Sequence, residues 1–548
     1  MDEVGIVLAM LLAVVASGYL VRILPFAVPL PLVQIALGAA ISGTTSHGVR
    51  LEPHIFFLLF LPPLLFLDGW RIPKVGLFRD RTTILELALG LVLFTVIGAG
   101  FLIHWLIPSL PLAVSFALAA ILAPTDPVAV SSIAARVPIP PRLMHILEGE
   151  SLLNDASGLV CFRFAVAAAL TGTFSLGEAT LTFLWVALAG IAIGAGLTTG
   201  VSWAQRLLAA RIGEESGSPI LVNLLLPFGA YLAAEHVQAS GILAAVAAGI
   251  TMSYVELSGR ALATTRVRRA VVWDTVQFAL NGIMFVLLGE QLPSIVKAAL
   301  VAPELPAAHD VWWLLGNALA ISVGLILLRF VWVWVSLRLT LLAARRQQQA
   351  VYRPNPRLIL ATSLAGVRGA ITLAGVLTLP LALPGGAPFP GRDLVIFLAS
   401  AVIVVSLVLA SVGLPRVLRG LELPAEPAHQ SEEDQARHAA TLAALEGIAA
   451  APPPPPTAGC DLEAAAEMHA SAAEQVRSLY QYRLDGGTGA GIDPHQARAA
   501  ESAERHYRLA ALEQEREVLL RMARHNQLSD EIARKLLREI DLVEARYR

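Results

Sequence analysis

The run DLVIFLASAVIVVSLVLASVGLP, at residues 393–415, shows most plainly which kind of fold this chain adopts. After Asp393 it contains no charged side chain. A helix of about 20 apolar residues is long enough to cross the hydrocarbon of a bilayer. A helix also satisfies the hydrogen bonds of its own backbone, and it must do so because hydrocarbon offers no partner for backbone N–H and C=O groups. The run therefore predicts a membrane-spanning helix.

Comparable apolar runs recur toward the N-terminus, and the overall composition agrees with them. The 548 residues are 56% hydrophobic and only 15% charged, and the mean hydropathy is +0.66. A soluble protein with an ordinary polar surface is excluded by these values. A transmembrane barrel would need short segments that alternate between apolar and polar residues, whereas runs such as 84–107 are continuous. The sequence predicts an all-α polytopic membrane protein.

The runs place about thirteen transmembrane helices between residue 3 and residue 415. The expected spans are 3–20, 28–43, 53–69, 84–107, 112–135, 146–171, 179–203, 218–236, 239–257, 270–292, 311–342, 358–383 and 393–415. The first run follows Asp2 and Glu3 instead of a basic segment, so we read it as a span and not as a cleaved signal peptide.

Basic residues in the expected loops predict the orientation of the chain. Alternate loops are rich in arginine, and the opposing loops hold only Arg50, Lys297 and Arg392. Because cytoplasmic loops carry the excess of Lys and Arg, we expect the N-terminus outside and the C-terminal tail in the cytoplasm. The expected location is the inner (plasma) membrane of a bacterial cell, crossed many times.

Three regions are expected from the change in composition along the chain. Residues 1–420 form the transmembrane domain, residues 421–460 a Pro-rich linker containing APPPPP at 451–456, and residues 461–548 a helical cytoplasmic tail rich in Ala, Glu, Leu and Arg. The net charge of −2 gives no reason to expect a nucleic-acid partner.

The segment ILAPTDPVAV, at 121–130, places a carboxylate inside an apolar span, where a charge is expensive and usually functional. Asp126 lies between Pro124 and Pro127, and proline removes a helix donor and disturbs the preceding turn. We expect a locally unwound stretch in which Thr125 and Asp126 lie beside free backbone carbonyls, as in the cation sites of transporters. The alternative is a simple kink in which Asp126 caps the continuing helix.

The segment EGESLLNDASGLV, at 148–160, gives the next span a polar face. Residues four apart share a helix face, so Ser151 lies under Asp155 and Glu150 lies under Asn154. Oxygen ligands suit hard cations, and the carboxylate of Asp155 can instead take a proton. Na⁺ and H⁺ would then compete for one group. The alternative is a polar seam that joins helices without transporting anything.

The segment SLAGVRGAITLAGV, at 363–376, predicts a second interrupted span, because Arg368 lies between Gly366 and Gly369. Arg368 could neutralise Asp126 or pair with Glu150. We favour Glu150, since a buried charge without a partner is costly.

Two further arginines, Arg163 and Arg329, lie within apolar spans. We expect them to be structural counter-charges, because an ionisable side chain in a membrane span needs a partner.

The motifs TDPVAV, GESLLNDASGLV and GVRGAITLAG, in this order, resemble the core signatures of the monovalent cation:proton antiporter-1 family, the sodium/proton exchangers. The resemblance covers residues from about 3 to 420. It implies two inverted repeats, a homodimer, and a core domain with crossed discontinuous helices that moves like an elevator.

The resemblance also implies roles for single residues. Asp155 would bind the ion and carry the proton, with Thr125 and Ser151 as further Na⁺ ligands and Asp126 supporting the site. Asn154 stands where electrogenic relatives have a second aspartate, which implies electroneutral exchange of one Na⁺ for one H⁺.

The family's stabilising ion pair corresponds to Glu150 and Arg368, which the resemblance places on either side of Asn154. The expected structural pair is therefore Glu150 with Arg368.

The expected function is Na⁺/H⁺ antiport by alternating access, serving pH and sodium homeostasis. The cargo would be H⁺ and Na⁺, with Li⁺ or K⁺ as alternatives. We expect neither a cofactor nor an enzymatic activity, because the sequence contains no HExxH or GxSxG motif. The nearest rival is a K⁺/H⁺ antiporter on the same scaffold, and a rival of another class is a cation channel or membrane receptor.

Overall fold

The structure is a computed structural model, and it describes most of the chain. The described residues are 3–24, 28–43, 53–71, 86–126, 130, 141–171, 176–212, 217–257, 263–301, 311–346, 356–383, 386–419, 427–452, 462–488, 494–525 and 530–547. These residues divide into two compact units, Met1–Leu421 and Glu422–Arg548.

The first unit is helical throughout its described part, apart from one isolated β-bridge between Ala382 and Pro388. Its elements are α1 (Glu3–Ile23), α2 (Leu30–Ser42), α3 (Pro53–Arg71), the π-helical turn η1 (Glu86–Leu91), α6 (Val92–Leu106), α7 (Leu112–Leu122), α9 (Pro141–Thr171), α10 (Leu176–Ile212), α11 (Ser218–His236), α12 (Gly241–Leu257), α13 (Ala263–Leu300), α14 (Val311–Arg346), α15 (Pro356–Leu364), α16 (Ala370–Leu377) and α17 (Arg392–Leu418).

The predicted all-α membrane fold is confirmed. Among the described residues, eight helices are long and apolar enough to cross a membrane, and three shorter apolar helices accompany them. Each predicted span overlaps at least one of the helices above.

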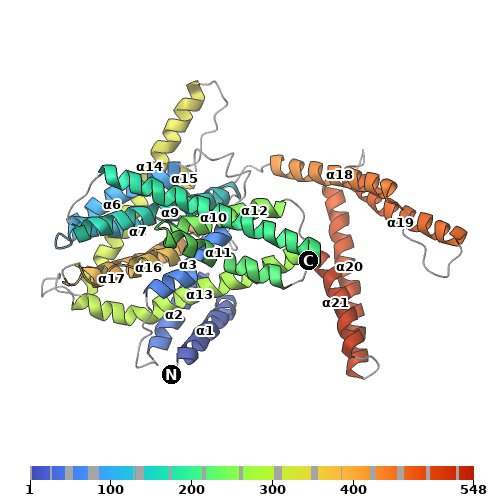
Figure 1. The fold of residues 1–548 in the computed structure, drawn as a ribbon, viewed down its shortest axis with the longest axis horizontal. Helices are drawn as coiled ribbons and strands as arrows, with labels where there is room; N and C mark the ends of the chain where they lie inside the picture. Colours follow the sequence, from blue (N-terminus) through green and yellow to red (C-terminus); the bar gives the residue numbers. More distant parts are fainter. Residues whose placement is uncertain are drawn as a thin grey trace. The chain divides into compact units, whose positions relative to one another are not determined.

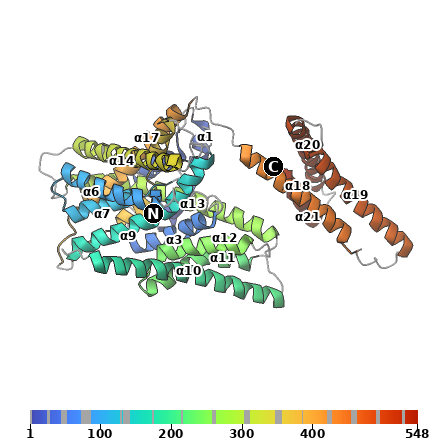
Figure 2. The same ribbon diagram turned by 90° about the horizontal axis from the view of Figure 1, so that it is seen from above.

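Helix packing separates the first unit into two bundles. The flanking bundle contains α1, α2, α3 and α10 to α13, and the crossing bundle contains η1, α6, α7, α9 and α14 to α17. Figure 2 shows α10, α11 and α12 gathered on the side opposite to α14 and α17. The bundles meet mainly where α3 and α13 pack against α9, α16 and α17.

Small residues allow close helix packing in the flanking bundle. A Cβ atom on Gly38 of α2 would lie 1.9 Å from the Val286 carbonyl oxygen of α13, and one on Gly289 would lie 1.9 Å from the Ile35 carbonyl oxygen of α2. Helices in membranes associate through close backbone packing of this kind, because the hydrophobic effect contributes little to helix association within hydrocarbon.

Two helix interruptions face each other in the crossing bundle. Helix α7 ends at Leu122 and is followed by non-helical residues 123–126, while residues 365–369 separate α15 from α16. The Asp126 backbone N–H donates to the Val367 carbonyl oxygen over 2.7 Å and joins the two interruptions. The unwinding predicted at Pro124 and at Gly366 to Gly369 is therefore present.

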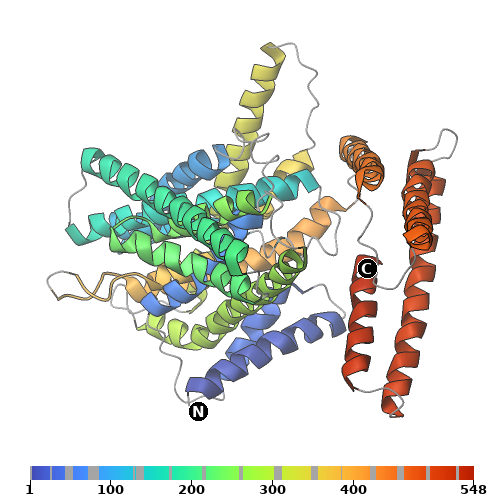
Figure 3. The ribbon, with the colours of Figure 1, turned by 45° about the vertical axis from the view of Figure 1, so that its right-hand side comes forward.

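The end of α14 projects beyond the neighbouring helices as the upright yellow helix of Figures 1 and 3. This end carries Arg338, Arg345 and Arg346.

The second unit contains α18 (Pro427–Ala450), α19 (Leu462–Thr488), α20 (Pro494–Arg524) and α21 (Asp530–Tyr547). Helix α18 packs on α19 and α20 packs on α21, with Arg516 of α20 paired to Asp541 and Glu544 of α21.

Helix α18 corrects the predicted linker at 421–460. Residues 427–450 are rich in the helix formers Ala, Glu and Leu. The proline run from which a linker was predicted begins only at Pro452. Most of that run, 453–456, lies outside the described residues.

Candidate ion-binding site

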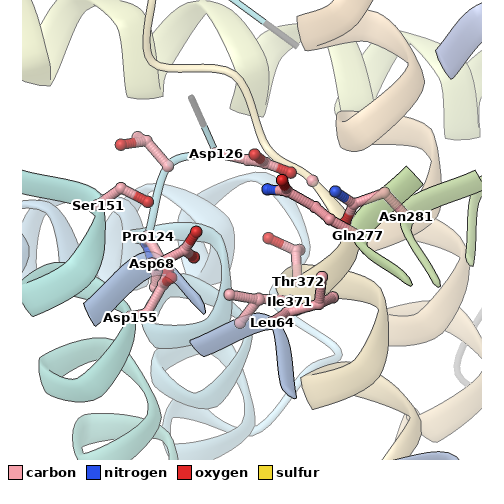
Figure 4. Close-up of a pocket in the computed structure, with 12 residues that line it drawn as sticks. Leu64, Asp68, Pro124, Asp126, Ser151, Asp155, Gln277, Asn281, Ile371 and Thr372 are labelled. Carbon is pink, nitrogen blue, oxygen red and sulfur yellow. The ribbon is translucent and has the colours of Figure 1, made fainter. Parts of the chain in front are cut away.

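A small cavity lies where the two bundles meet, at the interruption after α7 (Figure 4). Its volume is about 30 Å³, more than the roughly 10–15 Å³ that one buried water needs, so it has room for at least one water or one small ion. Three carboxylates line it, together with hydroxyl, amide and apolar groups: Leu64, Asp68, Pro124, Thr125, Asp126, Ser151, Asp155, Gln277, Asn281, Gly369, Ile371 and Thr372.

Helix α9 supplies Asp155 and Ser151, which share one face because they are four residues apart. Both are buried, Asp155 with only 2% of its surface exposed. Gly158, almost one turn beyond, lets α9 approach the interruption, since a Cβ there would lie 2.4 Å from the Pro124 side chain.

The interruption after α7 supplies Thr125, which is buried, and Asp126, which is half-buried. The Asp126 side chain lies directly against the second interruption, because a Cβ atom on Gly369 would be only 1.7 Å from its Oδ2 atom. Glycine at 369 therefore makes room for the Asp126 carboxylate.

Arg368 corrects one prediction, since it does not pair with Glu150 in the described structure. Its Nε donates to the Leu122 carbonyl oxygen over 2.9 Å, and its Nη1 donates to the Gly366 carbonyl oxygen. The last carbonyls of a helix lack partners within it and form its negative end. Arg368 thus satisfies the end of α7 and binds the two interruptions to each other.

Glu150 is paired instead with Arg329 of α14. Arg329 donates to both carboxylate oxygens, with Nη2 2.7 Å from Oε2 and Nη1 bound to Oε1. Such a two-pronged contact is the strongest form of this pair. Arg329 is thus the buried ion-pair partner of Glu150.

Asn154 and Thr125 extend this ion pair toward the cavity. The Asn154 amide donates to Thr125 Oγ1 over 3.0 Å, and Thr125 Oγ1 lies 3.4 Å from Glu150 Oε1. Asn154 is buried but does not line the cavity. It is therefore placed behind the ion site, linked to Glu150 through Thr125 and not held between Glu150 and Arg368.

Arg163 lies away from the cavity. Its Nη2 is 3.2 Å from Glu235 Oε1 of α11, and both side chains are partly exposed. This pair joins α9 of the crossing bundle to α11 of the flanking bundle.

Four polar lining residues were missed by the sequence analysis: Asp68, Gln277, Asn281 and Thr372. Asp68 carried a signal, because it is an ionisable residue in the apolar run 53–69 and the rule applied to Asp126 and Asp155 covers it equally. Neutral amides and hydroxyls carry no comparable signal in a single sequence.

The charges around the cavity define what it can bind. The described lining contains three acidic side chains and no basic one, so a cation or protons must offset the negative charge. Among the described residues, no three His, Cys, Asp or Glu side chains converge as a metal-binding group.

Known proteins resemble this chain over most of its length. The family described as "Sodium/hydrogen exchanger, transmembrane" matches residues 8–420. The chain is 41% identical over 543 residues to the "Uncharacterized Na(+)/H(+) exchanger YjcE" of Escherichia coli strain K12, covering 98% of each chain. It is 43% identical over 417 residues to the "Sodium, potassium, lithium and rubidium/H(+) antiporter" of Bacillus pumilus, covering 75% of this chain and 61% of that protein.

A solved structure supports the fold. The sodium proton antiporter MjNhaP1 of Methanocaldococcus jannaschii superposes with a TM-score of 0.57 at 19% identity, covering 76% of this chain and 99% of that chain. The family match spans both helix interruptions and the carboxylates between them, and the chain belongs to the sodium/hydrogen exchanger family of membrane-embedded monovalent cation/proton antiporters.

Proposed function

We propose that this protein exchanges one Na⁺ for one H⁺ by alternating access, with Asp155 as the group that binds either ion. The observation that carries the proposal is the cavity between the two interruptions, where buried Asp155 meets Ser151, Thr125 and Asp126. Carboxylate and hydroxyl oxygens are the ligands that hard cations prefer.

The mechanism follows from the cost of moving charge through hydrocarbon. An ionised carboxylate without a bound cation would cost much free energy there. The site therefore crosses when Asp155 holds either Na⁺ or a proton. On the outside Asp155 takes a proton and releases Na⁺, and inside it releases the proton and takes Na⁺. Competition for one group couples the two flows.

Electroneutral stoichiometry is part of the proposal and depends on position 154. Asn154 is neutral and lies behind the cavity, so position 154 adds no second charge to the one that Asp155 binds in each direction. Asn154→Asp is expected to make exchange respond to membrane potential.

The physiological setting is proposed from the sequence. The protein would act as a homodimer in the inner (plasma) membrane, with its N-terminus outside and its tail in the cytoplasm, and would serve pH and sodium homeostasis.

K⁺/H⁺ antiport is a second candidate, because the Bacillus pumilus relative is named for sodium, potassium, lithium and rubidium. Oxygen ligands alone do not determine the size of the ion. Li⁺ and K⁺ are therefore tested beside Na⁺.

The test is proton flux in proteoliposomes loaded with a pH dye, on adding Na⁺, Li⁺ or K⁺ in turn. We expect a Na⁺-driven pH change in the wild type and none in Asp155→Asn that inserts normally. Exchange by Asp155→Asn would disprove the assignment of the site, a response to K⁺ alone would change the ion, and flux without proton coupling would favour a channel.

A further inference from the structure

Thr372 lies in the first turn of α16, just after the second interruption, and it lines the ion cavity. Only 2% of its surface is exposed. Figure 4 shows Thr372 across the cavity from Ser151 and Asp155 of α9. The side chain therefore belongs to a different wall of the cavity from the groups that the sequence predicted.

The Thr372 hydroxyl makes no hydrogen bond to any residue that the structure describes. Within a helix, such a hydroxyl commonly donates to the carbonyl four residues before it, as Thr362 does to Leu358 and Ser363 does to Ile359. The residue four before Thr372 is Arg368, which lies in the non-helical segment 365–369. The break in the helix therefore removes the usual partner of this hydroxyl.

A hydroxyl in this position has a cost and a use. Burying a polar group without a hydrogen-bond partner costs free energy, and the Thr372 side chain is almost fully buried. A hydroxyl oxygen also has two lone pairs, which a hard cation can take as a ligand. A cation in the cavity would therefore supply the partner that the helix does not.

The size of the cavity brings its opposite walls together around one occupant. A volume of about 30 Å³ leaves little space between the lining groups and an ion. An ion bound to Asp155 and Ser151 in this cavity would lie close to the wall formed by α16, which packs against α3, α7 and α13.

We propose that Thr372 is a further ligand of the transported cation and determines specificity for the cation against the proton. A proton forms a covalent O–H bond with one carboxylate oxygen, whereas a hard cation needs several oxygen ligands. The Thr372 oxygen therefore contributes to binding of Na⁺ and not to binding of H⁺. The inference rests on the proposed function and deepens it.

The first experiment compares Thr372→Val and Thr372→Ser with the wild type in proteoliposomes. Valine keeps the branched shape and removes the oxygen, so the KM for Na⁺ is expected to rise about tenfold, with the maximal rate within about twofold. Serine keeps the oxygen and should hold KM within about threefold of the wild type. Equal KM shifts in both variants would overturn the inference, because only one of them lacks the hydroxyl.

Thr378→Val is the matched control. The Thr378 hydroxyl donates to the Gly375 carbonyl oxygen over 2.6 Å, and Thr378 does not line the described cavity. This variant makes the same chemical change near the other end of α16 and should leave the KM for Na⁺ unchanged.

A second experiment measures cation binding without transport. Ligand binding raises the melting temperature according to the ratio of ligand concentration to Kd, so the protein is melted in detergent over a series of Na⁺ concentrations, with choline at equal ionic strength. Thr372→Val should need about tenfold more Na⁺ than the wild type for the same rise in melting temperature. A lower melting temperature without Na⁺, together with an unchanged Na⁺ response, would assign Thr372 a structural role and overturn the inference.

The outcomes separate the two proposals. A wild type without cation-dependent proton flux, or an active Asp155→Asn, contradicts the proposed function. Normal wild-type flux with an unshifted KM and an unshifted Na⁺ response in Thr372→Val contradicts this inference alone.

Discussion

Glu150 is wholly buried in α9, and the Arg329 guanidinium binds both of its carboxylate oxygens. The pair ties α9 to α14 directly behind the ion cavity, while Thr125 links it to the interruption after α7. Removal of either residue would leave the other as a buried charge without its direct ion-pair partner.

Arg329→Ala is therefore expected to destabilise the protein by about 3–5 kcal/mol, the usual cost of leaving one buried charge unpaired. The melting temperature in detergent, measured by the loss of the monodisperse chromatographic peak, reports this. Glu150→Gln combined with Arg329→Gln should melt above Arg329→Ala, because no lone charge remains. A double variant that melts below Arg329→Ala would show that the pair does more than balance charge.

Gly369→Ala is expected to abolish exchange, because the new Cβ atom would overlap the Asp126 carboxylate at 1.7 Å. The measurement is Na⁺-driven proton flux in proteoliposomes. Gly316→Ala in α14, where a Cβ meets nothing within 4 Å, is the matched control and should exchange normally. Full activity of Gly369→Ala would show that Asp126 can leave the position described here without cost.

At the scale of elements, backbone approach and backbone pairing hold the helices together. The two interruptions share a direct backbone hydrogen bond and the Arg368 contacts, and α2 lies against α13 through glycines. In hydrocarbon the backbone groups at the two interruptions would otherwise lack a partner.

Gly38→Leu is expected to separate α2 from α13 and to lower stability by more than about 3 kcal/mol, because its Cβ atom alone would lie 1.9 Å from a carbonyl oxygen. Thermal melting in detergent measures the effect. Gly200→Leu in α10, where nothing lies within 4 Å, should melt like the wild type. Equal melting of the two variants would count against tight α2–α13 packing.

At the scale of the whole molecule, the chain has two units, and the described ion cavity lies entirely in the first. The residues of α18 to α21 pair among themselves.

Truncation after Leu421 is expected to leave the KM for Na⁺ within about twofold of the full chain, since binding energy comes from the cavity groups. Proteoliposome flux at matched protein density is the measurement. A well-inserted truncated protein with a changed KM would assign the tail a part in ion binding.

The predicted orientation can be tested with the chain's own cysteines, Cys161 and Cys460. In a Cys161→Ala variant, a membrane-impermeant maleimide should label Cys460 only after the cells are permeabilised, because the basic loops place the tail inside. Labelling of Cys460 in intact cells would indicate the opposite orientation.

The sequence alone was enough for the fold class and for most of the cavity. Long apolar runs predict membrane helices because hydrocarbon leaves the backbone few alternatives, and prolines and glycines mark where those helices break. Asp126 and Asp155 were found because a charge in a span is expensive. Thr125 and Ser151 were found because one precedes Asp126 and the other lies one helical turn from Asp155.

Tertiary structure decided which charges meet. Glu150 could pair with either of two arginines from distant helices, and only packing brings Arg329 of α14 to it while Arg368 turns to the carbonyls of Leu122 and Gly366. Sequence spacing orders residues along one helix, whereas an ion pair between helices depends on how those helices pack. Gln277 could not be predicted as a cavity residue for the same reason. Its place at the cavity depends on how α3 and α13 pack against α9 and α16.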